Sequence, residues 1–319
     1  VFDFFNGMND SGNTVATMIS TGVLKPRRAL MLASIAELLG PFLFGVAVAA
    51  AIGQGIVNPS AAKPLVVLAA LVAAIVWNLT TLYVGLPSSS SHALVGGRVG
   101  AATIAAGVGA INPRGIAVVL SAMVLSPLMG FVLSYLAMRG IKAIAKNATP
   151  RINTYFRQGQ IATSVALALS HGTNDAQKTM GIITLALVAF GVLPEFRVPT
   201  WVVALSAVTI ASGMFAGGWR VIRTLGSKVY RIRPVHGFSA QLTSAVVIVG
   251  AALLGGPVST THVVSSSIIG VGTAERLSKV RWEVARNIVL AWVVTIPMSA
   301  VIAGVLYLGL SSLAAVGAT

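Results

Sequence analysis

The chain has 319 residues, of which 56% are hydrophobic and 9% charged, and it carries a formal net charge of +15 without any cysteine. A soluble chain would carry roughly a quarter charged residues, so the composition excludes an ordinary globular domain and indicates an integral membrane protein. Without cysteine the chain can form neither disulfides nor thiolate metal sites. The positive charge does not indicate nucleic-acid binding, because the basic residues fall in loops between apolar segments.

Ten apolar segments follow one another along the chain, and they predict an all-α integral membrane protein. Seventeen Lys and Arg residues lie in one set of alternate loops and three in the other. The positive-inside rule therefore places the basic loops in the cytoplasm, and we expect a multi-pass protein of a bacterial-type cell (inner) membrane. The segments cover approximately residues 1–23, 29–52, 64–85, 87–110, 115–138, 159–193, 199–222, 238–255, 257–274 and 287–313.

An acidic motif occurs twice inside these segments. NGMNDSGNTVAT at 6–17 and SHGTNDAQKTMG at 170–181 align with a constant offset of 165 residues, which places Asp10 on Asp175. An ionised carboxylate at membrane depth is expensive, so each motif predicts a functional site. The sixth segment is too long for one straight span, and we expect its helix to break at His171–Asp175. The alternative is a buried polar cluster that only stabilises helix packing.

A second motif is also duplicated. GLPSSSSHALVGG at 85–97 matches GGPVSTTHVVSSS at 255–267 with an offset of 170 residues. Five segments separate equivalent positions, so the second half would enter the membrane upside down relative to the first. We predict a first repeat over 1–138, a basic cytoplasmic connector over 139–157 and a second repeat over 158–319, with broken helices. Whether the fourth and ninth segments cross or turn back as re-entrant hairpins is left open.

The alignment of the two halves also concerns the start of the chain. Residue 1 matches residue 166, yet the sixth segment begins near Gln158. The first repeat therefore lacks one to two helical turns, and we expect the natural chain to continue N-terminally of Val1.

The hydroxyl-rich motifs predict an anion site. A proline before a run of hydroxyls suits the first turn of a helix, where unpaired N–H groups and the helix dipole attract anions. Two such helix starts, one from each half, could close on one oxyanion; the alternative is that the hydroxyls only pack helices.

His92 and His262 follow the hydroxyls and are candidates for proton transfer or for a structural role. Glu37 and Arg98 have no counterpart in the other half, and each is either a charge lining a cavity or half of a buried pair.

These residues resemble the inorganic phosphate transporter (PiT) family. The resemblance covers both halves and rests on the duplicated G-x-N-D elements, the Pro-Ser/Thr-His elements and GGWRVIRTLG at 217–226. It implies a secondary active transporter, not an enzyme, that moves inorganic phosphate with Na⁺ or H⁺ by alternating access and uses no cofactor. It implies no nucleic-acid partner; whether the protein forms a homo-oligomer is left open.

The resemblance also implies site residues. The expected phosphate ligands share hydroxyl or ammonium donors: Ser88, Ser89, Ser90, Ser91, Ser259, Thr260, Thr261 and Lys178. The expected cation ligands share amide or carboxylate oxygens: Asn9, Asp10, Asn13, Asn174 and Asp175, with Asp10 and Asp175 binding Na⁺ if transport is sodium-coupled.

One position departs from the family pattern. Many members have an amide three residues after Asp in both repeats, as Asn13 is here, but the second repeat has Lys178. The Lys ammonium could pair with Asp175 or contact phosphate, and we expect fewer sodium sites than in a symmetric member. The pattern resembles the low-affinity branch, for which proton coupling and metal–phosphate complexes are expected; sulfate is the rival substrate.

A channel and an intramembrane serine hydrolase using Ser91 or Ser89 with His92 are weaker alternatives. The hydrolase is disfavoured because adjacent helical residues do not face each other.

Overall fold

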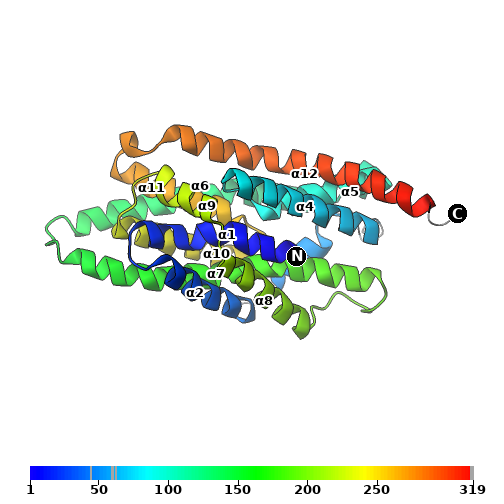
Figure 1. Ribbon diagram of the computed structural model, residues 1–319, viewed down its shortest axis with the longest axis horizontal. Helices are drawn as coiled ribbons and strands as arrows, with labels where there is room; N and C mark the ends of the chain where they lie inside the picture. Colours follow the sequence, from blue (N-terminus) through cyan, green and yellow to red (C-terminus); the bar gives the residue numbers. More distant parts are fainter. Residues whose placement is uncertain (44, 59–60, 62, 317–319) are drawn as a thin grey trace.

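The computed structural model describes residues 1–43, 45–58, 61 and 63–316. Regular structure in these residues is helical, apart from one isolated bridge between Val57 and Ile111. The principal helices are α1 (Phe2–Ser20), α2 (Pro26–Leu39), α3 (Ala47–Gln54), α4 (Pro64–Val84), α5 (Ser90–Ala106), α6 (Pro113–Ile144), α7 (Ile152–Ala189), α8 (Thr200–Ala216), α9 (Trp219–Arg223), α10 (Pro234–Leu253), α11 (Thr260–Glu275) and α12 (Trp282–Val316). The short turns η1 (Gly40–Phe42), η3 (Val108–Ala110), η4 (Thr224–Lys228) and η5 (Leu277–Lys279) connect them, and Figure 1 shows the main helices running along the long axis.

Four of the described helices, α4, α6, α10 and α12, are long and apolar enough to cross a membrane. Two bent pairs raise the number to six: Pro26–Phe42 with Ala47–Gly53 at 80°, and Thr200–Ala216 with Trp219–Lys228 at 61°. The remaining predicted segments correspond to α1 and α7, which carry many polar residues, and to the short helices α5 and α11. The all-α membrane fold predicted from the sequence is thus confirmed.

The predicted break in the sixth segment is wrong. α7 is one continuous helix of 38 residues through His171–Asp175. Its polar side chains find partners on neighbouring helices, so the backbone has no need to unwind to satisfy them. The extra length projects beyond the apolar region at the Ile152 end, where most side chains are exposed. The neighbouring segment bends instead, at Gly217, whose φ of 75° lies in the left-handed region that glycine tolerates.

α5 and α11 begin in the interior of the protein. Ser89 and Ser259, their N-cap residues, are each 1% exposed. The C-terminal end of α11 lies beside the start of α10, where Arg233 Nη2 donates to Glu275 Oε1 at 2.8 Å. α10 and α11 therefore form a hairpin whose tip lies inside the molecule, and the tip between α4 and α5 meets it there.

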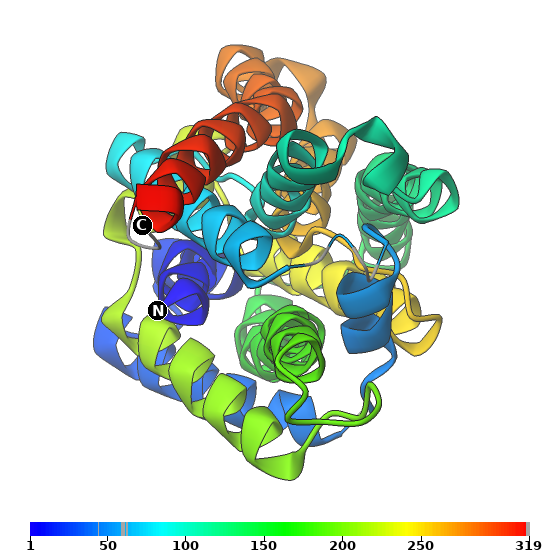
Figure 2. The same cartoon turned by 90° about the vertical axis from the view of Figure 1, so that its right-hand side faces the viewer.

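α7 occupies the centre of the bundle. Figure 2, seen along the bundle, shows α7 in green enclosed by other helices. It packs against α10, α3, α2, α8 and α1, whereas α6 packs on α11 and α12 on α5. The outer helices α6 and α12 expose apolar side chains such as Leu125 and Val293, as expected for surfaces that face lipid. The central helix is therefore the element on which a buried site can be built.

Glycines of the acidic motifs permit close helix packing around that centre. A Cβ added at Gly172 would lie 2.3 Å from the Glu37 carbonyl oxygen of α2, and one at Gly7 would lie 2.2 Å from the Ile210 carbonyl oxygen of α8. Only glycine allows this approach, so these two positions fix how closely α2 and α8 press against the motif helices.

Candidate functional site

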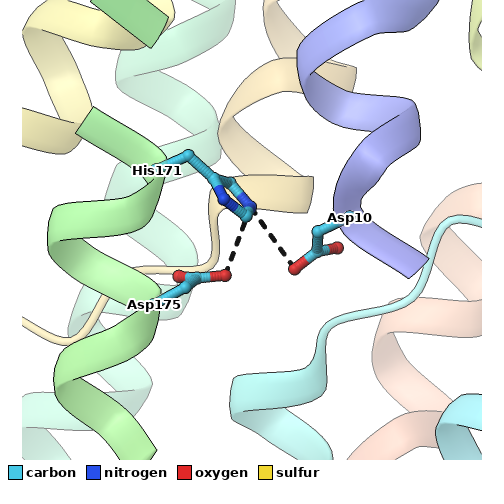
Figure 3. A group of neighbouring side chains, drawn as sticks. All are labelled: Asp10, His171 and Asp175. Atoms are coloured by element: carbon cyan, nitrogen blue, oxygen red, sulfur yellow. Dashed lines mark ion pairs between the residues drawn. The ribbon is translucent and has the colours of Figure 1, made fainter. Parts of the chain in front are cut away.

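The two acidic motifs meet at one buried histidine. His171 Nε2 lies 3.5 Å from Asp10 Oδ2 and 3.3 Å from Asp175 Oδ2, so carboxylates from α1 and α7 share one imidazole (Figure 3). His171 Nδ1 lies 2.7 Å from Glu37 Oε1 on α2. All four side chains are at most 2% exposed. The cluster thus concentrates three carboxyl groups around one titratable ring.

Lys178 places a positive charge beside Asp175 on α7. Its ammonium bonds to Asp175 Oδ1 and lies 3.2 Å from the Val258 carbonyl oxygen at the tip before α11. Lys178 is 1% exposed, and a buried ammonium is tolerated only with such partners. The predicted pairing of Lys178 with the acid of its own motif is present in the structure.

The hydroxyl-rich helix starts converge on these acids. Thr261 Oγ1 lies 2.8 Å from Asp10 Oδ1, and Thr260 Oγ1 lies 3.2 Å from Asp175 Oδ2. The side chains of Ser89 and Ser259 cap their helices by accepting from the backbone N–H of His92 and His262, both at 3.3 Å. The N-terminal turn of α11 therefore lies against the carboxylate cluster, which places anion-attracting groups beside acidic ones. Thr261 Oγ1 also lies 3.2 Å from the Ser88 carbonyl oxygen, just before α5.

The asparagines of the two motifs make the same contact in both halves. Asn9 Nδ2 donates to the Ser88 carbonyl at 3.3 Å, and Asn174 Nδ2 donates to the Val258 carbonyl at 3.1 Å. Asn13 Nδ2 donates to Asp10 Oδ1 at 2.9 Å. The Oδ1 atoms of all three asparagines are buried and have no hydrogen-bond partner within the described residues. These amide oxygens are free to accept from a ligand or to coordinate a cation.

His92 and His262 lie against each other where the two helix starts meet. Their ring centroids are 4.4 Å apart in an edge-to-face arrangement, and the His262 ring stacks on Trp292 at 4.0 Å. None of the four ring nitrogens has a hydrogen-bond partner in the part of the chain that the structure describes. Their present contacts are packing contacts, and neither ring bonds a backbone carbonyl within the described residues.

The site residues expected from the sequence are all nearly fully buried, at 5% exposure or less: Asn9, Asp10, Asn13, Glu37, Ser88, Ser89, Ser90, Ser91, His92, Asn174, Asp175, Lys178, Ser259, Thr260, Thr261 and His262. Glu37 proves to be half of a buried pair, with His171. Arg98 instead donates to the carbonyl oxygens of Ile52 and Gly53 at the end of α3, where it satisfies a helix terminus.

Several residues at the site had no role predicted from the sequence. His171 is the most central of them, and its spacing of four residues from Asp175 on a helix was the available signal. Gln177 Oε1 accepts from the Val48 backbone N–H at 2.9 Å and so ties α3 to α7. Trp77 Nε1 lies 3.1 Å from Ser88 Oγ and 3.0 Å from Thr295 Oγ1, which fixes the first hydroxyl-rich tip. The Gln177 contact with α3 and the Trp77 contact with Thr295 join segments that no sequence pattern relates.

Comparison with known proteins identifies the family to which this chain is similar. The model of the phosphate transporter family matches residues 6–303. A probable low-affinity inorganic phosphate transporter of Bacillus subtilis is 45% identical over 310 residues, covering 96% of this chain and 93% of the relative. One of the same description from Rhizobium meliloti is 44% identical over 308 residues, covering 96% and 92%.

A solved structure described as the sodium-dependent phosphate transporter superposes with a TM-score of 0.86 at 26% identity, covering 97% of this chain and 96% of that one. The family match spans both acidic motifs and both hydroxyl-rich motifs. The chain belongs to the phosphate transporter family and is a multi-pass protein of the cell membrane.

Proposed function

We propose that this protein is a secondary transporter that carries inorganic phosphate across the membrane together with a cation. The observation that carries the proposal is the meeting of Asp10, Asp175 and Glu37 at His171, directly beside two hydroxyl-rich helix starts. One half of this site suits an anion, the other half a cation, and neither suits catalysis of a covalent step. The relatives described as phosphate transporters support phosphate as the substrate.

Phosphate would bind between the first turns of α5 and α11. Unpaired backbone N–H groups and the hydroxyls of 88–91 and 259–261 would donate to its oxygens, and Lys178 would add a positive charge. Thr260 and Thr261 now lie within hydrogen-bond distance of the motif carboxylates. An anion entering here faces those carboxylates, so binding is unfavourable until their charge is neutralised.

That neutralisation is the proposed basis of coupling. Three ionised carboxyl groups would carry three negative charges, and Lys178 supplies one positive charge. A proton on His171 and one further cation would make the cluster neutral. Moving a phosphate dianion against 100 mV costs roughly 4–5 kcal/mol, and accompanying cations remove this cost. Because such coupling is reciprocal, the cation should tighten phosphate binding by the same factor that phosphate tightens cation binding.

We propose the proton as the coupling ion. Lys178 already occupies the Asp175 side of the site, where a sodium ion would otherwise bind. Imidazole is the side chain whose charge changes between pH 5 and 8, and His171 contacts all three acids. Asn9 and Asn13 have amide oxygens without partners near Asp10, and such oxygens can coordinate sodium. Sodium is therefore the alternative coupling ion.

Labelled-phosphate uptake into proteoliposomes, with proton and sodium gradients imposed separately, tests this proposal. We expect an inward proton gradient to drive accumulation above equilibrium and a sodium gradient alone to drive little. Accumulation driven by sodium and indifferent to pH would show that the coupling ion is wrong. Uptake that needs no gradient and shows a unitary conductance would instead indicate a channel.

A second candidate substrate is a neutral metal–phosphate complex. One ligand atom each from Asp10, His171 and Asp175 lie within 4.8 Å of one another, which is the spacing of a divalent-metal site. Uptake of labelled metal and labelled phosphate in equal amounts, each dependent on the other, would support this candidate. Excess unlabelled sulfate provides the control for substrate identity, because hydroxyl donors suit either tetrahedral anion.

We further propose that the protein is built from two inverted repeats, 1–138 and 158–319, that rock about the shared site. The matching amide-to-carbonyl bonds of Asn9 and Asn174 and the matching caps of Ser89 and Ser259 support this proposal. α6 extends to Ile144 and α7 begins at Ile152, so both helices reach into the expected connector.

A further inference from the structure

A second polar cluster lies on α1, away from the central site. Asp3 is 2% exposed, and neither of its carboxyl oxygens has a hydrogen-bond partner within the described residues. Asp3, Asn6 and Asp10 lie at i, i+3 and i+7 and so share one face of the helix. Asp3 stands roughly 10 Å from Asp10 along the helix axis, two turns earlier.

Three side chains from three helices surround this carboxyl. Asn6 of α1 and Thr179 of α7 are the polar side chains beside it. Thr179, Ser206 of α8 and Asp3 together line a cavity of about 340 Å³ whose remaining wall is largely apolar, including Leu71 and Ile75 of α4. The amide of Asn6 and the hydroxyls of Thr179 and Ser206 are also buried without partners in the described part of the chain. A group of unpaired polar atoms at this depth indicates a site for a small polar species.

The charges around Asp3 determine which species fits. Asp3 has the sole titratable side chain among the described residues that line the cavity. Lys178, the cationic side chain of α7 nearby in sequence, is bonded to Asp175. α8 carries no titratable residue, and the titratable residue of α4, Tyr83, lies exposed at the far end of that helix. An isolated carboxylate in such surroundings is too costly to remain ionised and takes up a proton instead.

The cluster lies on the outer side of the central site. Arg157, in the basic connector, donates to the Gly22 carbonyl just beyond the C-terminal end of α1 at 3.2 Å. That end of α1 is therefore cytoplasmic by the positive-inside rule, and Asp3 lies toward the opposite surface. Figure 1 shows the N-terminal end of α1 pointing away from the loop between α6 and α7.

We propose that Asp3 is the proton-loading site on the outer side of the transporter, an inference that rests on the proposed proton-coupled phosphate transport. A proton from external water adds to a carboxylate oxygen of Asp3 and gives the neutral acid. On release the O–H bond breaks, and the proton passes through water along the Asn6 face of α1 to the His171 cluster. Asp3 does not touch phosphate, so it acts on coupling and not on substrate binding.

The Asp3→Asn variant tests the inference, because asparagine has the shape of the protonated acid and fixes the neutral state. In proteoliposomes we expect exchange of labelled for unlabelled phosphate, without gradients, to stay within about twofold of wild type. Accumulation driven by an inward proton gradient should fall at least tenfold. Thr209→Val is the matched control, since Thr209 lines the same cavity but its hydroxyl bonds its own helix at Leu205; both activities should remain.

Three outcomes would overturn the inference. Accumulation by Asp3→Asn equal to that of wild type would make the cluster structural. Loss of a sodium-driven component, with the proton-driven one retained, would make the cluster a sodium site. Loss of exchange together with accumulation in a folded variant would place Asp3 in substrate handling. If wild type itself exchanges no phosphate, the proposed function fails instead.

Thr179→Val provides a second test should Asp3→Asn not fold. Valine has the shape of threonine but no hydroxyl, so Thr179→Val removes a polar group from the cavity beside Asp3. The ionised form of Asp3 should then be harder to accommodate, and Asp3 should bind its proton more tightly. The external pH at which uptake is half-maximal should therefore shift upward relative to wild type and Thr209→Val. An unchanged pH profile in a folded, transporting Thr179→Val protein would contradict the proposal.

Discussion

Single side chains at the centre explain why this site differs from a symmetric one. Asn13 and Lys178 occupy matching positions of the two motifs, three residues after each Asp. Asn13 leaves its amide oxygen free, whereas Lys178 places an ammonium on Asp175. The sequence predicts this difference directly, because both residues belong to aligned motifs. It does not predict the link between Glu37 and His171, which are 134 positions apart and meet only through the packing of α2 on α7.

Replacing Lys178 should change the ion that drives transport. Lys178→Asn restores the amide found at Asn13 and removes the ammonium that competes with sodium. We expect phosphate uptake by this variant to gain stimulation by sodium at constant pH. Lys63→Asn, at an exposed lysine before α4, is the control and should not gain it. Unchanged cation dependence in Lys178→Asn would remove Lys178 as the reason for fewer sodium sites.

A charged cluster where the end of α11 meets the start of α10 makes a separate prediction for stability. Partial burial alone would raise the pKa of Glu275, but Arg233 and Lys142 outweigh it and hold that pKa below its usual value. A lowered folded-state pKa means that Glu275 stabilises the protein above its unfolded pKa and that this effect is lost as the pH falls through the folded value. Glu275→Gln should cost about 1 kcal/mol or less at pH 7, because both basic partners are largely exposed.

Thermal unfolding in detergent between pH 3 and pH 7 measures this effect. The unfolding temperatures of wild type and Glu275→Gln should differ at pH 7 and converge toward pH 3. A difference that stays constant over this range would contradict the assignment of the charge.

At the scale of elements, apolar periodicity predicts the helices well and their interruptions poorly. Almost every expected segment has its helix or bent pair, because burial in lipid requires long apolar runs with paired backbone groups. The break at His171–Asp175 was expected from polarity and did not occur, since those side chains bond to α1, α2 and the tip before α11. Whether a polar run unwinds a helix depends on partners from other helices, which the run itself does not specify.

The close packing of α2 on α7 gives a test at this scale. Gly172→Ala would place a Cβ 2.3 Å from the Glu37 carbonyl oxygen, so the helices must separate. We expect a loss of about 2–3 kcal/mol in stability, as for overpacking of an interior, with weakened transport because Glu37 moves from His171. Gly140→Ala is the matched control: nothing lies within 4 Å of its added Cβ, and removing a helical glycine should stabilise slightly. Equal effects of the two substitutions would contradict the packing argument.

At the scale of the whole molecule, the two duplicated motifs were enough to predict which distant segments meet. Acids of α1 and α7 and hydroxyls of α11 come together in the structure, as expected if the two proposed halves surround one point. The sequence does not give the depth of the hairpin tips or the cavity beside Asp3, since both depend on how four or more helices pack.

Alternating access predicts opposite changes on the two sides of the site, which the variants Ser206→Cys and Thr17→Cys would report. Ser206 of α8 lines a cavity with Asp3, near the N-terminal end of α1. Thr17, whose hydroxyl accepts from Gln241 Nε2 at 2.7 Å, lies near the C-terminal end of α1. The chain has no native cysteine, so each introduced thiol is the sole target of a maleimide. Saturating phosphate should raise the labelling rate at one position and lower it at the other. Changes in the same direction at both positions would contradict rocking about a central site.

The account depends most on the claim that Asp10 and Asp175, through His171, make phosphate binding depend on a cation. Phosphate binding to purified wild type, Asp10→Asn and Asp175→Asn, measured by titration from pH 5 to pH 8, tests it directly. We predict that wild type binds phosphate more tightly as the proton concentration rises. Each variant, verified as folded, should lose this pH dependence, because one carboxylate no longer has to be neutralised. If both variants bind phosphate with the affinity and the pH dependence of wild type, the shared acidic cluster is not the coupling site.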